Sequence, residues 1–483
     1  MGEEHIVGKI VITGSLKLVS PLLIGSGQDD YLSDNDKDIH VMKVMDDRGR
    51  MQCVIPGTSI AGVLRELVAE QCRLRNSGIN NRQIYRELYQ LFGELDIMQS
   101  SIDVNDVILE NAQIVYRDGV RIDEDMGAAI DGAKYDYEAV DRGADGKLRL
   151  VITLRGIHTE NPAEWQTANI RPEILNVVFY IRECLEKGIR LGAMTAKGLG
   201  QIKVEHVQAG LYDFANAKDV TNWLLQEIPD SQRAGKFLQE KSSWTDRSNY
   251  MSVDADFALK SSLIIRDYGT EVKTQDGRRV TISLKNKKEY IIPGTSIKGV
   301  LRHQAAYILD SLGQRKDFLS DLMGSSESGK RNDTTEGRVK SRFFVDEVYI
   351  AEGKKAAVQA KEITRNRIDR FTGGTIESAL FAERPLWQHD DRVPTVHLRF
   401  FIKDADDKDA GLALFLLKDL WQGKIAIGGE AGVGRGTLKG LSAKITYHDK
   451  TYELDMNGRL IAGNPDALEH LAKAFVIYAK EEV

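Results

Sequence analysis

The segment VIPGTSIAGVLR at residues 54–65 returns as IIPGTSIKGVLR at residues 291–302, so that Pro56 and Pro293 lie 237 positions apart. Two further pairs follow in the same order: Arg-Ile-Asp at 121–123 and 367–369, and Gly-Leu-Gly at 198–200 with Gly-Arg-Gly at 434–436. Ordered internal matches are the sign of a repeated structural unit. The chain is therefore a tandem duplication.

The duplication predicts two modules. We expect a first module at 1–210, a partly helical linker at 211–250, a second module at 251–450 and a partly helical C-terminal tail at 451–483. With 483 residues the chain is long enough for two or three domains of ordinary size, which agrees with this division.

Composition and charge exclude several classes of protein. Hydrophobic residues make up 42% and charged residues 29% of the chain, as in a folded protein rather than a disordered one. Uninterrupted runs of about 18 apolar residues do not occur, so no membrane span is expected. The acidic start is unlike an export signal, and we expect a cytoplasmic protein. A net charge of -6 excludes a uniformly basic surface, so any contact with RNA has to be local.

Each copy repeats one order of elements. Alternating apolar residues predict an opening strand in Ile10–Leu18 and in Phe257–Ile265. A helix follows each Pro-Gly-Thr-Ser turn, with a threonine or serine as the expected N-cap. Strands come next, then a second helix from Pro172 or over Leu412–Trp421, a glycine-rich loop and a final strand. Strand, helix, strands, helix, strand is the order of an α+β fold of the ferredoxin-like, or RRM-like, type.

The start of the repeated helix is a candidate phosphate site, because a helix N-terminus presents free N–H groups and partial positive charge. In the second copy Lys298 and Arg302 lie one turn apart on one helix face. The first copy keeps Arg65 but has Ala61 in place of the lysine. The alternative is a tight turn that only joins a strand to a helix. The polar residues at the two helix starts that would contact RNA are Thr58, Ser59, Thr295 and Ser296.

Glycine-rich loops precede the last strand of each copy, GAMTAKGLG at 192–200 and GGEAGVGRG at 428–436. They follow a helix and open a strand, whereas dinucleotide-binding and Walker loops follow a strand and open a helix, and this excludes that class. Glycine lets the backbone approach an extended ligand closely, with Lys197 or Arg435 supplying positive charge. Plain turn geometry is the alternative.

These motifs together resemble those of the backbone RAMP (repeat-associated mysterious protein) subunits of type III CRISPR complexes. Both copies carry all three motifs, so the resemblance covers most of the chain apart from the linker and the tail. Two copies in one polypeptide are similar to the two-module fusions of subtype III-D. The resemblance implies that each module grips guide RNA and that a thumb hairpin wedges into the guide–target duplex. The partners it implies are guide (CRISPR) RNA, complementary target RNA, other backbone subunits and the large polymerase-like subunit.

The resemblance places the second thumb hairpin at residues 361–383. Alternation puts Lys361, Arg365 and Arg367 on one strand face, suited to phosphates, and leaves Phe371 to stack on a base. An ordinary solvated basic strand is the alternative. In the first copy Arg121 is the corresponding RNA-binding candidate, although the acidic residues after it oppose phosphate binding. Met126 is the candidate apolar wedge there.

Several members of the family cut target RNA with a divalent metal and an aspartate in the loop before the repeated helix. In the first copy the resemblance points to Asp38, with Asp36 in reserve. In the second copy it points to Asp276, with Asp267 in reserve. A carboxylate there would hold Mg²⁺ or Mn²⁺ beside the reacting phosphate. The structural alternatives are a plain acidic loop in the first copy and an Asp-Gly turn in the second.

Several functions remain open at this point. The leading one is an RNA-guided, metal-dependent endoribonuclease subunit, and its main rival is an inert scaffold that only binds guide RNA. Related nucleases that process guide precursors use histidine, which makes His40 the candidate residue for that activity. An enzyme unrelated to nucleic acid is a further class, although the sequence has no nucleotide loop, zinc pattern or nucleophile elbow that favours it.

Overall fold

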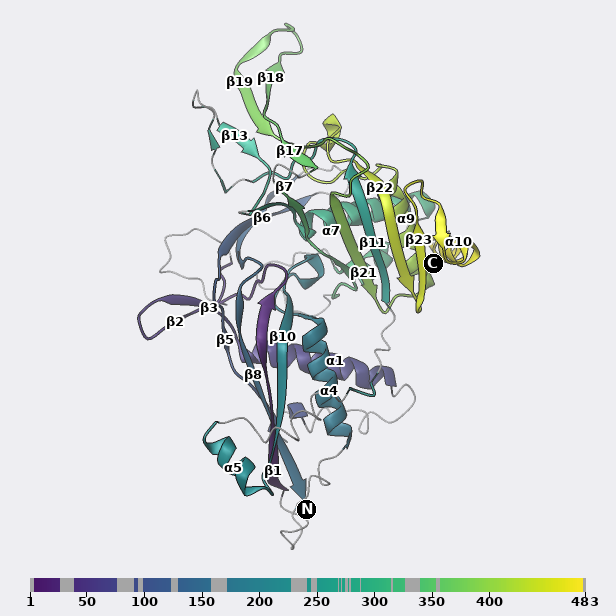
Figure 1. Ribbon diagram of the computed structural model, residues 1–483. Coiled ribbons are helices and arrows are strands. Elements are labelled where there is room, and N and C mark those ends of the chain that lie inside the picture. Colours follow the sequence, from purple (N-terminus) through teal and green to yellow (C-terminus); the bar gives the residue numbers. More distant parts are fainter. Residues whose placement is uncertain are drawn as a thin grey trace. The chain divides into compact units, whose positions relative to one another are not determined.

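The computed structural model divides the chain into two compact units (Figure 1). Unit 1 holds Met1–Tyr116, Asp136–Thr195 and Leu199–Ser248, and unit 2 holds Arg117–Tyr135, Ala196–Gly198 and Asn249–Val483. The structure describes residues 4–26, 39–75, 91–93, 99–122, 129–157, 172–226, 241–244, 250–267, 269–270, 272–273, 277, 279–286, 288–313, 316–325, 339–352 and 357–480. Over these ranges, no helix has the length and apolar character needed to cross a membrane.

An antiparallel sheet forms the centre of unit 1, with strand order β4-β8-β1-β10-β9. Its strands are β1 (Glu4–Leu18), β4 (Ile102–Val104), β8 (Asp145–Ile157), β9 (Ile189–Arg190) and β10 (Gln201–Asp213). The helices are α1 (Gly57–Arg75), α4 (Pro172–Lys187) and α5 (Ala217–Leu224). Ile10, Ile12 and Leu16 of β1 are fully buried, because alternate residues of a strand share one face. Val177, Ile181 and Leu185 are buried on α4, which packs on β10.

Two smaller sheets accompany this part of the chain. One has the order β2-β3-β5, and the other is the hairpin β6-β7. Their bounds are β2 (Lys43–Met45), β3 (Met51–Ile55), β5 (Val107–Ile108), β6 (Ile114–Ile122) and β7 (Ala129–Val140). Strand β3 leads directly into α1, so this small sheet fixes where the repeated helix begins.

Unit 2 is built around a sheet of order β15-β21-β11-β22-β23-β24. Its strands are β11 (Tyr250–Leu259), β15 (Phe343–Val345), β21 (Val396–Lys403), β22 (Leu438–Tyr447), β23 (Lys450–Leu454) and β24 (Leu460–Ala462). The helices are α7 (Gly294–Leu312), α8 (Lys316–Met323), α9 (Asp407–Trp421) and α10 (Pro465–Lys480). Helix α9 packs on β11 and β22, and α10 packs on α9 with Phe475 fully buried. The last segment of the chain therefore adds both strands and core residues to unit 2.

A second sheet in unit 2, of order β12-β13-β19-β18, carries a long hairpin. Its strands are β12 (Val272–Lys273), β13 (Arg279–Ile282), β18 (Ile363–Ile368) and β19 (Thr375–Arg384). Two strand pairs complete the unit: β14 (Glu289–Ile292) with β16 (Val348–Ala351), and β17 (Val358–Ala360) with β20 (Leu386–Gln388). Figure 1 shows β18 and β19 projecting beyond the six-stranded sheet. The hairpin is thus an arm attached to the body of unit 2.

The two copies share one arrangement of elements. The order β1, α1, β4, β8, α4, β10 in the first copy matches β11, α7, β15, β21, α9, β22 in the second. The central strands also take matching places, β4-β8-β1-β10 and β15-β21-β11-β22. The predicted α+β content and the duplicated order of elements are confirmed.

The repeated turn differs from its prediction in one respect. At the start of α7 the N-cap is Pro293, with no side-chain hydrogen bond, so the expected threonine or serine cap is wrong there. A Cβ on Gly57 would overlap the carbonyl of Val104, and a Cβ on Gly294 would overlap the carbonyl of Lys197. The glycine of the motif is therefore required because backbone from another element passes directly over the helix start.

Replacing Arg342 with methionine is expected to lower the free energy of unfolding of unit 2 by about 3 kcal/mol. Nη1 of Arg342 donates to Oδ2 of Asp409 at 2.8 Å, and Asp409 is fully buried in the first turn of α9. Without the arginine this carboxylate would stay buried and unpaired. Urea unfolding at several pH values measures the loss.

The pH dependence of that loss has a defined sign. Burial raises the pKa of Asp409, so the folded state binds its proton more tightly than the unfolded state does. Loss of Arg342, whose charge lowers this pKa, should raise it further, so the destabilisation should grow as the pH rises through the range in which the carboxyl ionises. Arg392→Met removes an exposed ion pair with Asp390 and is the matched control, expected to change nothing measurable. Equal effects of the two substitutions would contradict the prediction.

Candidate functional site

The candidate catalytic residues Asp36, Asp38 and Asp276 lie outside the described residues, and so does Met126. For Arg121 the structure describes the backbone at the end of β6 but not the side chain. Among the residues that are described, no group of three or more His, Cys, Asp or Glu side chains is placed to hold a metal ion. Cleavage and its metal therefore stay predictions.

Two minor candidates, His40 and Asp267, are described. Nδ1 of His40 lies 3.5 Å from Oε1 of Glu138, a buried carboxylate that also binds Nζ of Lys43 at 3.2 Å. Asp267 accepts hydrogen bonds from the N–H groups of Gly269 and Thr270 at 2.9 and 3.2 Å. The contacts of Asp267 are those of a residue that shapes a turn.

Positive side chains gather at the start of α7 in unit 2. Nζ of Lys298 donates to Oγ of Ser341 at 2.6 Å and to the carbonyl of Phe343 at 2.8 Å. Nη1 of Arg302 donates to the carbonyl of Gly324 at 2.9 Å. Lys197, from the tip of the first glycine-rich loop, is close enough to Lys298 to affect its charge. Both acceptors of the Lys298 ammonium are neutral groups, so these hydrogen bonds hold the side chain in place without neutralising its positive charge.

The electrostatics of this cluster favour an anion. Burial, with added repulsion from Lys197 and Arg302, lowers the pKa of Lys298 to about 7. Burial and the charge of Arg302 also lower the pKa of Lys197. The side chain of Lys298 is only 6% exposed, so it would act on a phosphate mainly through its field rather than by direct contact. A phosphate at the helix start would relieve the repulsion between these cations.

The two helix starts are not equivalent. In α7 the residues Thr295 and Ser296 are half-buried. In α1, Thr58 and Arg65 are exposed and Ser59 is half-buried. The N–H of Gly57 already donates to Oδ1 of Asp106 at 2.8 Å. This carboxylate occupies the place where an anion would bind, so the start of α1 offers less to a phosphate than the start of α7 does.

The hairpin β18–β19 carries the predicted thumb residues. Lys361 and Arg367 are exposed, Arg365 is 30% exposed and Phe371 is completely exposed in the turn between the strands. Asp369 fixes that turn by accepting hydrogen bonds from the N–H groups of Phe371 and Thr372, both at 2.8 Å. The turn therefore presents Phe371 to solvent on an ordered backbone.

Strand register places one aromatic residue that the sequence analysis missed. Phe381 lies directly opposite Arg365 across the hairpin and is exposed by about two fifths. Directly opposed residues of an antiparallel pair share a face, so the side chains of Phe381 and Arg365 lie on the same face of the hairpin. Alternation within β18 alone does not reveal this neighbour, because the pairing with β19 is needed as well.

Arg435, predicted to face an RNA ligand, lies inside unit 2 instead. It is 3% exposed, with Nη2 3.1 Å from Oε2 of Glu383 and Nε 2.6 Å from Oε2 of Glu430. Arg365 reaches the same two carboxylates, at 3.7 Å from Glu383 and 3.1 Å from Glu430. Nη2 of Arg266 lies 3.0 Å from Oε1 of Glu430. We call these five residues the arginine–glutamate cluster.

The two glutamates of the cluster differ in proton affinity. Burial and a hydrogen bond to Glu430 raise the pKa of Glu383, which is 1% exposed. Burial acts against ionisation of Glu430 as well, but the hydrogen bond from Glu383 and the nearby arginines lower its pKa. Glu430 therefore gives up its proton more readily than Glu383, and both carboxyl groups lie beside the arginines. Glu430 is the one acidic residue in the loop sequence GGEAGVGRG, and this is the signal in the sequence that points to it.

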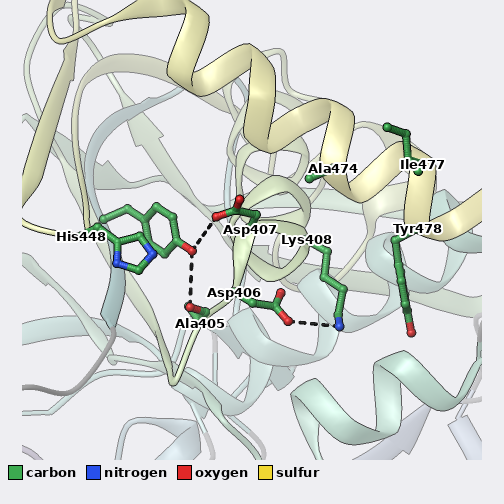
Figure 2. Close-up of a pocket in the computed structure, with 9 residues that line it drawn as sticks. Ala405, Asp406, Asp407, Lys408, His448, Ala474, Ile477 and Tyr478 are labelled. Atoms are coloured by element: carbon green, nitrogen blue, oxygen red, sulfur yellow. Dashed lines mark hydrogen bonds and ion pairs between the residues drawn. The ribbon is translucent and has the colours of Figure 1, made fainter.

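A shallow cavity of about 490 Å³ lies in unit 2 at the start of α9 (Figure 2). The hydroxyl of Tyr447 donates to Oδ1 of Asp407 at 2.9 Å, and Nζ of Lys408 lies 3.1 Å from Oδ2 of Asp406. Burial and the bond to Asp407 raise the pKa of Tyr447, which keeps its hydroxyl protonated as a donor. These groups bind one another, and none of the predicted site residues lines the cavity.

The duplicated α+β units and the cations at one helix start define a two-module protein with a candidate anion site. Comparison with family models then identifies its relatives. The model of the RAMP superfamily matches residues 15–203 and 274–439, one region in each copy, and the chain belongs to this superfamily. Membership implies a CRISPR-associated RNA-binding subunit, since members generally bind CRISPR RNA within multi-subunit complexes. No curated protein matches the sequence.

Proposed function

We propose that the chain is a guide-RNA-binding backbone subunit of a type III CRISPR interference complex, similar to the two-module fusions of subtype III-D. The observation that carries this proposal is the family match in both copies. Guide RNA, complementary target RNA, further backbone subunits and the large polymerase-like subunit are the partners. Each copy acts as a ferredoxin-like module, an assignment supported by the shared strand order β4-β8-β1-β10 and β15-β21-β11-β22.

The charge distribution supports a local grip on the RNA backbone. The chain has a net charge of -6, yet Lys197, Lys298 and Arg302 come together at the start of α7. Lys361, just before β18, and Arg367 of β18 are exposed, and Phe371 is exposed in the turn between β18 and β19. Basic groups that follow a backbone, together with an exposed aromatic ring, form the usual combination for binding a single strand.

Target cleavage is the second part of the proposal. A divalent ion, Mg²⁺ or Mn²⁺, would be bound by Asp38 in the first copy and by Asp276 in the second, with Asp36 and Asp267 in reserve. Support comes from the family resemblance and from the place of these residues before α1 and α7. A scaffold that binds guide RNA without cutting the target is the outcome expected if both aspartates are inert.

Native purification tests the first part. The assembled particle is expected to carry RNA, seen as an excess of absorbance at 260 nm that ribonuclease removes, and that RNA should contain repeat-derived sequence. A chain with Lys298→Met and Arg302→Met is expected to retain less RNA than one with Arg65→Met, because the first three turns of α7 hold two cations and those of α1 hold one. A particle free of RNA would refute the proposal, and equal losses would contradict the ranking of the two helices.

A further inference from the structure

The arginine–glutamate cluster joins three separate segments of unit 2. Glu383 and Arg365 belong to the arm β18–β19, Glu430 and Arg435 to the glycine-rich loop, and Arg266 to the segment after β11. Glu430 bridges all three, because it lies within 3.1 Å of all three arginines. This glutamate therefore ties the arm to the loop.

The first copy has uncharged residues at the same places in its glycine-rich loop. Met194 and Glu430 are non-glycine residues with left-handed backbones, at φ of 56° and 64°. Leu199 and Arg435 each precede a glycine with φ of 79°. The loop therefore keeps the same left-handed backbone at these positions whether it carries the charged pair or the apolar pair.

Glu383 and Arg266 also have uncharged counterparts in the first copy. Tyr137 and Glu383 each pair in parallel with the segment before the repeated helix. Gly25 and Arg266 each form the antiparallel bridge that closes the loop before that helix. Four of the five charged residues of the second copy thus have an uncharged counterpart in the first copy. The counterpart of Arg365 remains to be identified.

The arm supplies that last counterpart. Arg365 lies opposite Phe381, and in the first copy a Cβ on Gly119 would overlap the ring of Tyr135. The spacing of 16 residues is the same in both hairpins. The five correspondences are Glu430 with Met194, Arg435 with Leu199, Glu383 with Tyr137, Arg365 with Gly119 and Arg266 with Gly25.

Folding alone does not account for the charged set. Taking charges out of water costs free energy, and apolar replacements of buried ion pairs are often neutral or stabilising. The first copy shows that this backbone accepts such a replacement. What the charged set adds is a fixed guanidinium: Arg365 contacts two carboxylates and still has about a third of its side chain exposed. A side chain that is ordered beforehand loses less entropy when it binds a ligand.

We infer that Glu430, together with Glu383 and Arg435, positions the Arg365 guanidinium toward an RNA phosphate and holds the arm β18–β19 on the glycine-rich loop. The inference rests on the proposed RNA-binding function and adds a positioning set to it. The second module accordingly binds RNA with a fixed arm, whereas the first has no such ion-paired tie among its counterpart residues.

A double-mutant cycle tests this role. The loop variant Glu430→Met with Arg435→Leu gives the second loop the residues of the first, and Arg365→Met removes the proposed phosphate contact. Fluorescence anisotropy with a mixed-sequence single-stranded RNA should show about fivefold weaker binding for the loop variant and about tenfold for Arg365→Met. The combination should be no weaker than Arg365→Met alone, because the loop acts through that arginine. Each change should lower the salt slope of binding by about one.

The outcomes separate this inference from the proposed function. The positioning role would be overturned if the losses of RNA affinity from the loop variant and from Arg365→Met multiplied in the combined variant. Unaltered RNA affinity in the loop variant would also overturn it. An unfolding midpoint below that of the unaltered chain would overturn the claim that the fold does not need the charges. Glu430→Gln keeps the shape of the side chain, so a chain with this substitution is expected to bind RNA more tightly than one with Glu430→Met. RNA-free hydrogen exchange gives an independent readout, with faster exchange expected at Arg365 to Ile368 in the loop variant. Failure of the unaltered chain to bind any RNA would instead refute the proposed function.

Discussion

In an assembled complex with guide RNA, Asp38→Ala is expected to abolish one set of target-RNA cleavage products and Asp276→Ala another. A carboxylate that holds a hard cation beside the reacting phosphate stabilises the charge that develops during cleavage. Loss of one such group costs roughly 100-fold or more in rate. Denaturing gels of end-labelled target RNA, with Mg²⁺ or Mn²⁺ added, measure each product separately.

The controls for cleavage distinguish a lost site from a lost particle. Each variant is expected to assemble with the same amount of guide RNA as the unaltered chain, and chelation of the divalent ion should abolish both product sets. Asp36→Ala and Asp267→Ala test the two aspartates held in reserve. Asp267 accepts two backbone hydrogen bonds in its turn, so its substitution should leave cleavage close to normal. An unchanged product ladder in the double variant Asp38→Ala with Asp276→Ala would identify an inert scaffold.

Binding of RNA is expected to weaken as the pH rises above 7, by up to about tenfold per pH unit. The pKa of Lys298 is lowered to about 7 in the folded chain, chiefly by burial. Above that pH the side chain is neutral in the free protein, whereas a nearby phosphate favours the charged form. Binding must then take up a proton, and affinity falls as protons become scarce. Anisotropy titrations between pH 7 and 8.5 at constant ionic strength measure the effect.

The same shift fixes the sign of the effect on stability. The unfolded chain keeps this lysine charged up to its ordinary pKa of 10.5, whereas the folded chain releases the proton near pH 7. Unfolding between these values takes up a proton, so the free energy of unfolding should rise with pH across that window. Lys298→Met should remove both dependences, and Lys361→Met, which removes an exposed lysine of the arm, should remove neither. An RNA affinity that is constant up to pH 8.5 would rule out the predicted linkage.

Most of the fold could be predicted from local patterns. The alternation in Ile10–Leu18 and the helical spacing after Pro56 and Pro293 depend on neighbouring residues, and these elements lie where expected. The second opening strand instead covers Tyr250–Leu259 rather than Phe257–Ile265. The N-cap was not predictable in this way. Pro293 is the N-cap of α7, and the backbone that passes over the next residue, Gly294, comes from Lys197, far away in the chain.

The candidate site was predictable in its residue types but not in its contacts. Arg435 reads as a ligand-facing cation next to glycines, yet it is buried against Glu383, more than fifty residues earlier in the chain. Phe381 became a neighbour of Arg365 only once the hairpin register was known. Local sequence gives the charge of a side chain, whereas its partner depends on which distant strand pairs beside it.

The sequence alone determined that this protein is a duplicated α+β chain of RAMP type, because a repeat and its hydrophobic periodicity are local properties of the amino-acid order. Only the tertiary structure decided which cations are available to RNA and which are neutralised inside unit 2. The physical reason is that burial and ion pairing depend on long-range packing, which brings Glu430 to Arg365 and Arg435 in the second copy. In the first copy the same backbone positions carry uncharged side chains.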